Sequence, residues 1–141
     1  GDLKGIPVAI VHGRNDAILP PNHTSRAYAA LNSIAEKDGG GLRYYEVTNA
    51  HHLDVFNAFA GFDARYVPLQ CYLIRALDLI YENLVAGKAL PPSQVVRTVP
   101  RGLDQEGNAL PIRPANVPPI AEIPLETNRI SISKGKIVVP D

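Results

Sequence analysis

Two short segments, each followed by a polar loop, constrain the fold of this chain more than any other feature. Residues 6–11 form a continuous apolar run with several β-branched members, and residues 42–47 are rich in tyrosine and valine. The first pattern is typical of a strand buried on both faces of a parallel sheet, and the second also favours a strand. Two neighbouring parallel strands need a long crossover connection, and the residues between these two segments are numerous enough to form one. We therefore expect an α/β fold with a parallel sheet.

The residues between the two expected strands favour a helix. Pro20-Pro21 closes the loop after the first strand, and Asn22 is a residue type that caps helices. We expect the helix to run to about Glu36 and to stop at Asp38 and the glycines 39–41, because glycine accepts the left-handed conformation found after a helix end. Strand, helix and strand would then form a parallel crossover unit. Apolar residues at helical spacing are expected to face the sheet: Ala27, Ala30, Leu31 and Ile34.

A longer helix is expected from near Pro68 to Ala86, with Gly87 ending it. It carries one apolar stripe at the helical period: Leu69, Leu73, Ala76, Leu77, Ile80 and Leu84. Two strands and two helices are too little for a closed doubly wound domain. The sheet is therefore expected to have an exposed edge that lacks a neighbour in this chain.

Residues 90–141 are predicted to form a proline-rich C-terminal extension with β-hairpins. The first expected hairpin pairs residues 95–99 with 109–112 across a turn rich in Asp, Glu, Gly and Asn. The proline-rich stretch 111–124 is expected to be extended and to pack along a surface.

The second expected hairpin has a clearer register. Residues 129–133 and 136–139 flank the two-residue loop Lys134-Gly135. A loop of that length places four apolar side chains on one face of the hairpin: Ile130, Ile132, Ile137 and Val139. We therefore expect this face to pack against the rest of the fold.

Composition argues against several functional classes. The chain has 141 residues, of which 45% are hydrophobic and 20% charged, as is ordinary for a globular protein. Its 14 basic and 14 acidic residues give a formal net charge of 0, so it has no electrostatic footprint for nucleic acid or an anionic membrane. No apolar run approaches the roughly 20 residues that a membrane helix needs. We expect neither nucleic acid nor a membrane as a partner.

A carboxylate and a histidine follow the two expected strands. Asp16 comes shortly after the first strand, and His52 follows the second, with His51 beside it. Functional groups in open α/β sheets lie beyond the carboxyl ends of the strands. Taken alone, Asp16 could be a turn residue and His52 a loop histidine. Together, an acid after one strand and a histidine after the next match the order Ser, Asp, His of α/β-hydrolase triads.

The chemistry of such a triad explains these residue types, but the nucleophile is missing. A serine hydroxyl needs an adjacent base, and imidazole has a suitable pKa near neutral pH. The carboxylate fixes the imidazole tautomer and stabilises the imidazolium. No Gly-x-Ser-x-Gly elbow occurs in the sequence. We interpret residues 1–89 as the C-terminal part of a larger catalytic domain, whose serine lies upstream, and we expect the isolated segment to be inactive.

Other candidate residues have competing interpretations. His12 is favoured as a structural residue at the strand end. A zinc site is a weaker alternative, because no two histidines have the spacing of a His-Glu-x-x-His helix. Its ligands would come from this set: His12, His23, His51, His52 and Asp16. Phe56 and Phe59 either line a substrate pocket or pack the loop, and the sequence leaves both interpretations open. Asp54 is more consistent with a helix cap than with a catalytic acid.

Two segments carry a specific family resemblance. Residues 6–23, Ile-Pro-Val-Ala-Ile-Val-His-Gly-Arg-Asn-Asp-Ala-Ile-Leu-Pro-Pro-Asn-His, and residues 44–56, Tyr-Tyr-Glu-Val-Thr-Asn-Ala-His-His-Leu-Asp-Val-Phe, resemble the C-terminal region of the D-(−)-3-hydroxybutyrate oligomer hydrolases. Residues 90–102 and 115–120 fit the same family. The resemblance implies a serine esterase of α/β-hydrolase fold that cleaves 3-hydroxybutyrate oligomers to monomer, without a metal or organic cofactor.

The resemblance also implies roles for individual residues and partners. Asp16 would be the triad acid and His52 the base, with His51 as the alternative base. The implied partners are a small-molecule ester and the remainder of the same hydrolase polypeptide. Two other functions remain open from the sequence: another carboxylesterase of the feruloyl-esterase or tannase type, and a non-catalytic module that binds a partner.

Overall fold

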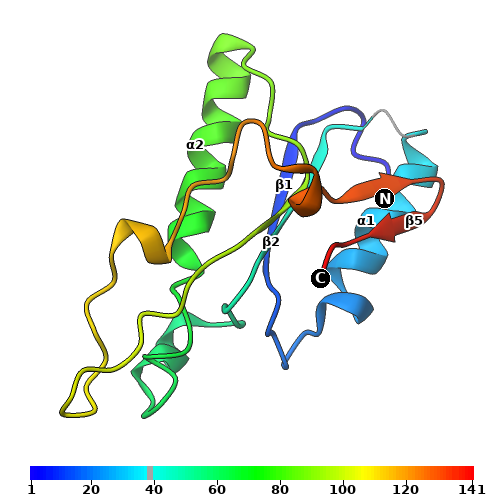
Figure 1. Ribbon diagram of the computed structural model, residues 1–141. Coiled ribbons are helices and arrows are strands. Elements are labelled where there is room, and N and C mark those ends of the chain that lie inside the picture. The colour runs from blue at the N-terminus through cyan, green and yellow to red at the C-terminus, as the bar shows by residue number, and fades with distance from the viewer. Residues whose placement is uncertain (38–39) are drawn as a thin grey trace.

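The structure is a computed structural model that describes residues 1–37 and 40–141 (Figure 1). Its described part contains a three-stranded parallel sheet with strand order β1-β2-β3, two α-helices and an antiparallel hairpin, β4-β5. The strands and helices are β1 (Val8–Gly13), α1 (Ser25–Ala35), β2 (Leu42–Val47), α2 (Gln70–Ala86), β3 (Gln94–Val96), β4 (Ser131–Ser133) and β5 (Lys136–Val138). Short 3-10 helices lie in the connections at Pro21–His23, Asp54–Ala58, Pro114–Asn116 and Glu126–Asn128.

The predicted strand–helix–strand unit is confirmed. β1 and β2 pair in parallel, in register from Val8 opposite Leu42 to Gly13 opposite Val47. β2 has the predicted bounds, whereas β1 begins and ends two residues later than the predicted 6–11. Pro7 explains the later start, because proline has no N–H to donate to a strand ladder.

The predicted sheet-facing side of α1 is wrong. Leu31 and Ile34 are exposed, and the buried residues of α1 are Ser25, Ala29, Asn32 and Ser33. These buried polar groups have partners from distant segments: the Ser25 hydroxyl lies 3.0 Å from the Tyr44 hydroxyl, and the Asn32 amide donates to the Gly1 carbonyl. The helix also starts later than predicted, because Asn22 lies in a 3-10 turn. It ends near the predicted Glu36, while Asp38 and Gly39 lie outside the described residues.

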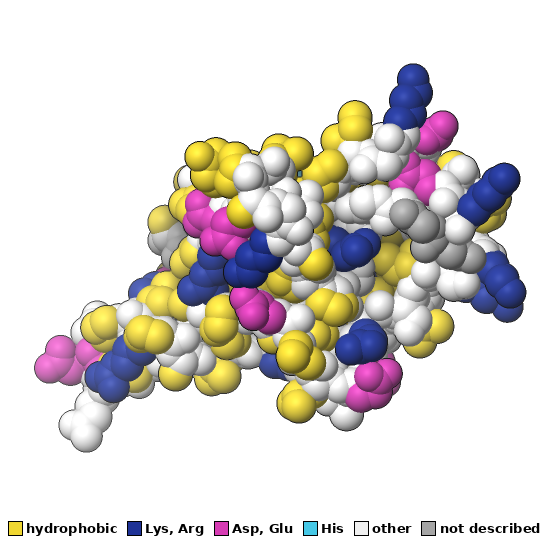
Figure 2. All heavy atoms as spheres, turned by 90° about the horizontal axis from the view of Figure 1, so that it is seen from above, with side chains coloured by type: hydrophobic (Ala, Val, Ile, Leu, Met, Phe, Trp, Pro, Cys, Tyr) yellow, Lys and Arg dark blue, Asp and Glu magenta, His cyan; other side chains and the backbone are white. Residues whose placement is uncertain are grey.

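The second helix forms as predicted, but its apolar stripe is largely uncovered. Gly87 ends α2 in the left-handed conformation, with φ of 66°. Of the predicted stripe, Ala76 is buried, whereas Leu73, Leu77 and Leu84 are 50%, 59% and 67% exposed. Figure 2 looks down on the end of α2 drawn uppermost in Figure 1, and hydrophobic side chains are exposed over much of that surface. None of the described helices is long and apolar enough to cross a membrane.

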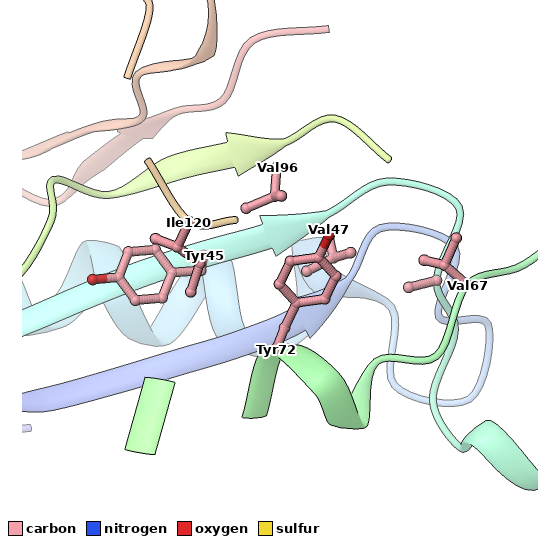
Figure 3. Close-up of a cluster of buried hydrophobic side chains, with 7 residues drawn as sticks. Tyr45, Val47, Val67, Tyr72, Val96 and Ile120 are labelled. Atoms are coloured by element: carbon pink, nitrogen blue, oxygen red, sulfur yellow. The ribbon is translucent and has the colours of Figure 1, made fainter. Parts of the chain in front are cut away.

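The sheet has a core on each face. Tyr44 and Tyr45 are consecutive in β2 and therefore point to opposite faces. Tyr72 of α2 lies against the Tyr45 face (Figure 3), where the buried cluster is Tyr45, Val47, Ala50, Val67, Tyr72, Val96 and Ile120. On the Tyr44 face, the hairpin supplies apolar side chains to a second cluster: Ile10, Tyr44, Val95, Ile130, Ile132, Ile137 and Val139. The second predicted hairpin is thereby confirmed, with Ile132 opposite Ile137.

The first predicted hairpin is wrong. Residues 95–99 do not pair with 109–112; instead β3 pairs in parallel with β2, with Val47 opposite Val96. What remains of the hairpin is a turn closed by one bridge between Leu103 and Ala109. Pairing with β2 buries Val95 and Val96 almost completely, which a surface hairpin would not do.

A buried carboxylate joins the elements near the ends of β1 and β2. Glu46 is fully buried and accepts hydrogen bonds from Arg14 Nε at 2.5 Å and from Arg26 Nε and Nη2 at 2.8 and 2.6 Å. Arg14 also donates to the Pro140 carbonyl, which ties the last residues of the chain to the same point. Burial would raise the pKa of Glu46, but the hydrogen bonds from Arg26 and Arg14 outweigh it and lower that pKa. Glu46 therefore stays ionised at neutral pH.

We predict that Glu46→Gln lowers the free energy of unfolding by about 3 kcal/mol at pH 7, because it leaves two partly buried arginines without their counter-charge. The matched control is Glu82→Gln, which removes an exposed partner of Lys88 and is expected to cost less than about 1 kcal/mol. Urea unfolding followed by circular dichroism measures both.

The same variant has a predicted pH dependence. The folded pKa of Glu46 lies below its ordinary value, so its contribution is present above about pH 4.3 and is lost as pH falls through the folded pKa. The stability difference between the parent chain and Glu46→Gln should therefore shrink at acid pH. A difference that is constant between pH 7 and pH 3 would contradict this assignment.

Candidate active site

The loops that leave β1 and β2 contact each other through their backbones. The Arg14 N–H donates to the Val47 carbonyl at 2.8 Å, and the Asn15 N–H donates to the Ala50 carbonyl at 2.9 Å. Gly13 permits this approach, because a Cβ there would lie 2.5 Å from the Ala50 oxygen. The two loops that carry the predicted acid and base are thus held side by side.

The carboxylate of Asp16 is buried and fixed by hydrogen bonds; the residue is only 5% exposed. Its Oδ1 accepts the backbone N–H groups of Ile18 and Leu19 at 2.9 and 2.8 Å. Its Oδ2 lies 2.8 Å from Nδ1 of His52. Burial would raise the pKa of Asp16, but the hydrogen bonds from Leu19, His52 and Ile18 outweigh it and lower that pKa. Asp16 is therefore ionised at neutral pH.

The contact with Asp16 fixes the tautomer of His52. An ionised carboxylate only accepts hydrogen bonds, so Nδ1 of His52 carries the hydrogen that is donated to Asp16. In the neutral ring, Nε2 then has the lone pair and can accept a proton. The His52 side chain is 31% exposed. It has the geometry of a general base that is oriented by a carboxylate.

His52 lies at a groove between the edge strand β1 and the start of α2. The groove has a volume of about 560 Å³ and is lined by Ala9, Ile10, Val11, His52, Leu53, Asp54, Leu69, Gln70 and Leu73. Asp54 accepts the backbone N–H groups of Leu69 and Gln70 and so fixes the start of α2. Leu69 and Leu73 of this groove were not recognised from the sequence as site residues, because their helical spacing alone indicates packing.

His51 has a different environment from its neighbour. It is buried, its Nε2 lies 2.9 Å from Asn57 Oδ1, and its ring stacks on Phe56 at 5.4 Å between centroids. Tyr66 meets the same ring edge-on at 4.7 Å. The structure thus brings Asp16 together with His52, while His51 belongs to an aromatic cluster.

Phe56 and Phe59 both belong to that aromatic cluster. Phe59 stacks on Phe56 at 5.8 Å, and Phe62 meets Phe59 edge-on at 6.3 Å. Neither Phe56 nor Phe59 lines the groove beside His52. Phe59 is 58% exposed, and a place for these two residues in a substrate pocket stays a prediction.

The two remaining histidines, His12 and His23, have different surroundings. His12 Nε2 lies 3.2 Å from Asp16 Oδ2, a contact that the sequence analysis missed although the two residues are four apart. His23 is exposed in the 3-10 turn before α1. Across residues 1–37 and 40–141, no group of three or more His, Cys, Asp or Glu side chains is arranged to hold a metal ion.

A buried carboxylate thus orients a histidine beyond the ends of two parallel strands, where functional groups of open α/β sheets lie. The chain belongs to the 3HB-oligomer hydrolase (3HBOH) family, whose family model matches residues 1–141. It is 54% identical to the D-(-)-3-hydroxybutyrate oligomer hydrolase of Paracidovorax citrulli, over 100% of this chain and 20% of the relative. The corresponding hydrolases of Cupriavidus pinatubonensis and Cupriavidus necator are 53% and 51% identical, with the same coverage.

The chain therefore spans 20% of the length of these curated relatives. No solved structure shows significant similarity to it.

We predict that Gly13→Ala separates the two loops, because its Cβ would meet a backbone oxygen that cannot move without shifting the loop before His51. The His52 Nδ1 proton, which is donated to a buried carboxylate, should then exchange faster with solvent in ¹H NMR. Gly61→Ala is the control: its φ of 79° makes alanine unfavourable, but its Cβ would contact nothing within 4 Å. Equal exchange rates in both variants would contradict the prediction.

Proposed function

We propose that this chain is the acid–base segment of a serine esterase of α/β-hydrolase fold, which cleaves 3-hydroxybutyrate oligomers to the monomer. The single observation that carries the proposal is the 2.8 Å contact between His52 Nδ1 and Asp16 Oδ2. The parallel strand–helix–strand unit, with the acid after β1 and the histidine after β2, supports the fold attribution. Membership of the 3HB-oligomer hydrolase family supports the substrate.

In the proposed reaction, His52 Nε2 takes the proton of a serine hydroxyl as the serine oxygen attacks the ester carbonyl. The imidazolium formed is stabilised by the ionised carboxylate of Asp16. When the tetrahedral intermediate collapses, the bond to the leaving oxygen breaks, and His52 gives its proton to the departing hydroxyl of the next hydroxybutyrate unit. A water molecule, activated by His52 in the same way, then releases the acyl group and regenerates the serine.

His52 is a better candidate for the base than His51. The His52 ring has one nitrogen on Asp16 and lies at an open groove. The His51 ring is buried between aromatic side chains, and its Nε2 is engaged by Asn57. A base must reach the proton that it takes, which favours His52.

The serine in this proposal comes from a segment of the hydrolase polypeptide outside these residues. Two features support such a partner. β1 is an edge strand, so one side of its backbone lacks a strand neighbour among the described residues. Beside it, α2 exposes leucines that would normally be buried, notably Leu73 and Leu77. We propose that the remainder of the polypeptide adds to β1 and covers this stripe, which would bring the serine to the groove at His52.

We predict that Asp16→Asn in the full-length hydrolase carrying this segment lowers kcat by about 10⁴-fold, because the amide favours the wrong imidazole tautomer. His52→Ala should lower kcat at least as much, since it removes the base. The kcat of both variants is measured from the release of 3-hydroxybutyrate from its dimer. Hydrolysis of an aromatic ester by the parent enzyme tests the substrate class. His23→Ala, which changes an exposed histidine of the loop before α1, is the control. Unchanged turnover by His52→Ala would refute the proposed mechanism.

We also predict that the 141-residue chain alone does not hydrolyse the dimer, because it carries an acid and a base but no serine on a strand-to-helix elbow. The measurement is product release by the purified chain over several hours. Robust turnover that His52→Ala abolishes would show that the nucleophile lies within these residues.

A further inference from the structure

We propose that His12 is a positioning residue of the acid–base pair, which holds the Asp16 carboxylate in the orientation that His52 needs. This inference rests on the proposed function and adds a second imidazole to it. His12 Nε2 lies 3.2 Å from Asp16 Oδ2, the same oxygen that lies 2.8 Å from His52 Nδ1. One carboxylate oxygen therefore faces two histidines from two different strand ends.

The surroundings of His12 determine where its ring hydrogen lies. Nε2 of His12 is 3.2 Å from Asp16 Oδ2 and 3.1 Å from the Leu19 carbonyl oxygen. Both neighbours are acceptors only, so Nε2 must carry the hydrogen; it donates a hydrogen bond to the Leu19 carbonyl, and the Asp16 oxygen lies close beside the same N–H. The His12 side chain is mostly buried, which limits replacement of these contacts by water. His12 thus presents an N–H dipole next to the Asp16 carboxylate even when its ring is neutral.

With His12 included, Asp16 has a polar neighbour on every side of its carboxylate. Oδ1 accepts two backbone N–H groups, from Ile18 and Leu19, and Oδ2 faces the two imidazoles. An ionised carboxylate offers about four lone-pair sites. A carboxylate held by three hydrogen bonds, with the His12 N–H beside its Oδ2, cannot rotate without breaking a bond, so the direction in which Oδ2 faces His52 is fixed before substrate binds.

His12 also fixes the loop that carries Asp16. Its donor reaches Leu19 O, while the Leu19 N–H donates to Asp16 Oδ1. Without His12, Oδ2 would keep one imidazole, and the carboxylate could turn toward the space that the ring had filled. We expect the proposed base to be less well oriented in that state, with little effect on substrate binding in the groove, which His12 does not line.

The test uses the full-length hydrolase and three substitutions of His12. His12→Leu removes the N–H donor but keeps a side chain of similar bulk, and His12→Ala removes both the donor and the bulk. His12→Gln keeps an N–H donor at about the distance from the backbone that the imidazole N–H has. We expect the first two to lower kcat by about 10- to 100-fold with KM unchanged, the range for loss of a hydrogen bond to a charged group. His12→Gln should restore most of kcat. His23→Leu is the matched control, because this histidine is exposed in the turn before α1.

A second readout separates positioning from a general loss of stability. In ¹H NMR, the His52 Nδ1 proton should exchange faster in His12→Leu and His12→Ala than in His12→Gln. The inference is overturned if either donor-free variant folds and keeps full kcat, or if His12→Gln is as impaired as both of them. If His52→Ala itself leaves turnover unchanged, the proposed function has failed and this inference falls with it. If His52→Ala is inactive and His12→Leu fully active, only the role of His12 is wrong.

Discussion

The buried carboxylate of Glu46 is hydrogen-bonded to arginines from two elements, Arg14 after β1 and Arg26 in α1. Burying such a charge is costly unless every partner is in place, so this interaction selects one arrangement of the elements around β2. Arg14 precedes Asp16 by two residues, and its backbone N–H is bonded to the Val47 carbonyl. The loop that carries Asp16 is therefore anchored to the central strand by a side-chain and a backbone contact.

The parts of the structure that local pattern decides could be predicted from the sequence. β2 has the predicted bounds, and the β4-β5 hairpin has the predicted register, because the Lys134-Gly135 loop has the positive φ values of 50° and 77° that two-residue hairpin loops require. The meeting of Asp16 and His52 follows from the same logic, since the carboxyl ends of neighbouring parallel strands adjoin. The roles proposed for these two residues still depend on the experiments.

The features that could not be predicted depend on partners far away in the sequence. The buried face of α1 is polar because Tyr44, Gly1 and Gly135 supply its hydrogen bonds, and no helical periodicity reveals them. β3 has a hairpin-like local pattern, yet it pairs with β2 because burial in the sheet outweighs a surface turn. The contact between His12 and Asp16 likewise depends on how the loop folds back, which spacing alone does not show.

The segment after α2 also reaches the two loops of the candidate site. Asn49, just before the histidines, donates to the Thr98 carbonyl, and the Thr98 N–H donates to the Thr48 hydroxyl. At the other end, the Pro140 carbonyl accepts from Arg14. The segment after α2 therefore contacts the loops at the ends of both strands. Its length is constrained by these contacts, which is unusual for a proline-rich connection. Insertions and deletions, which such segments commonly tolerate during divergence, would here be transmitted to the spacing between acid and base.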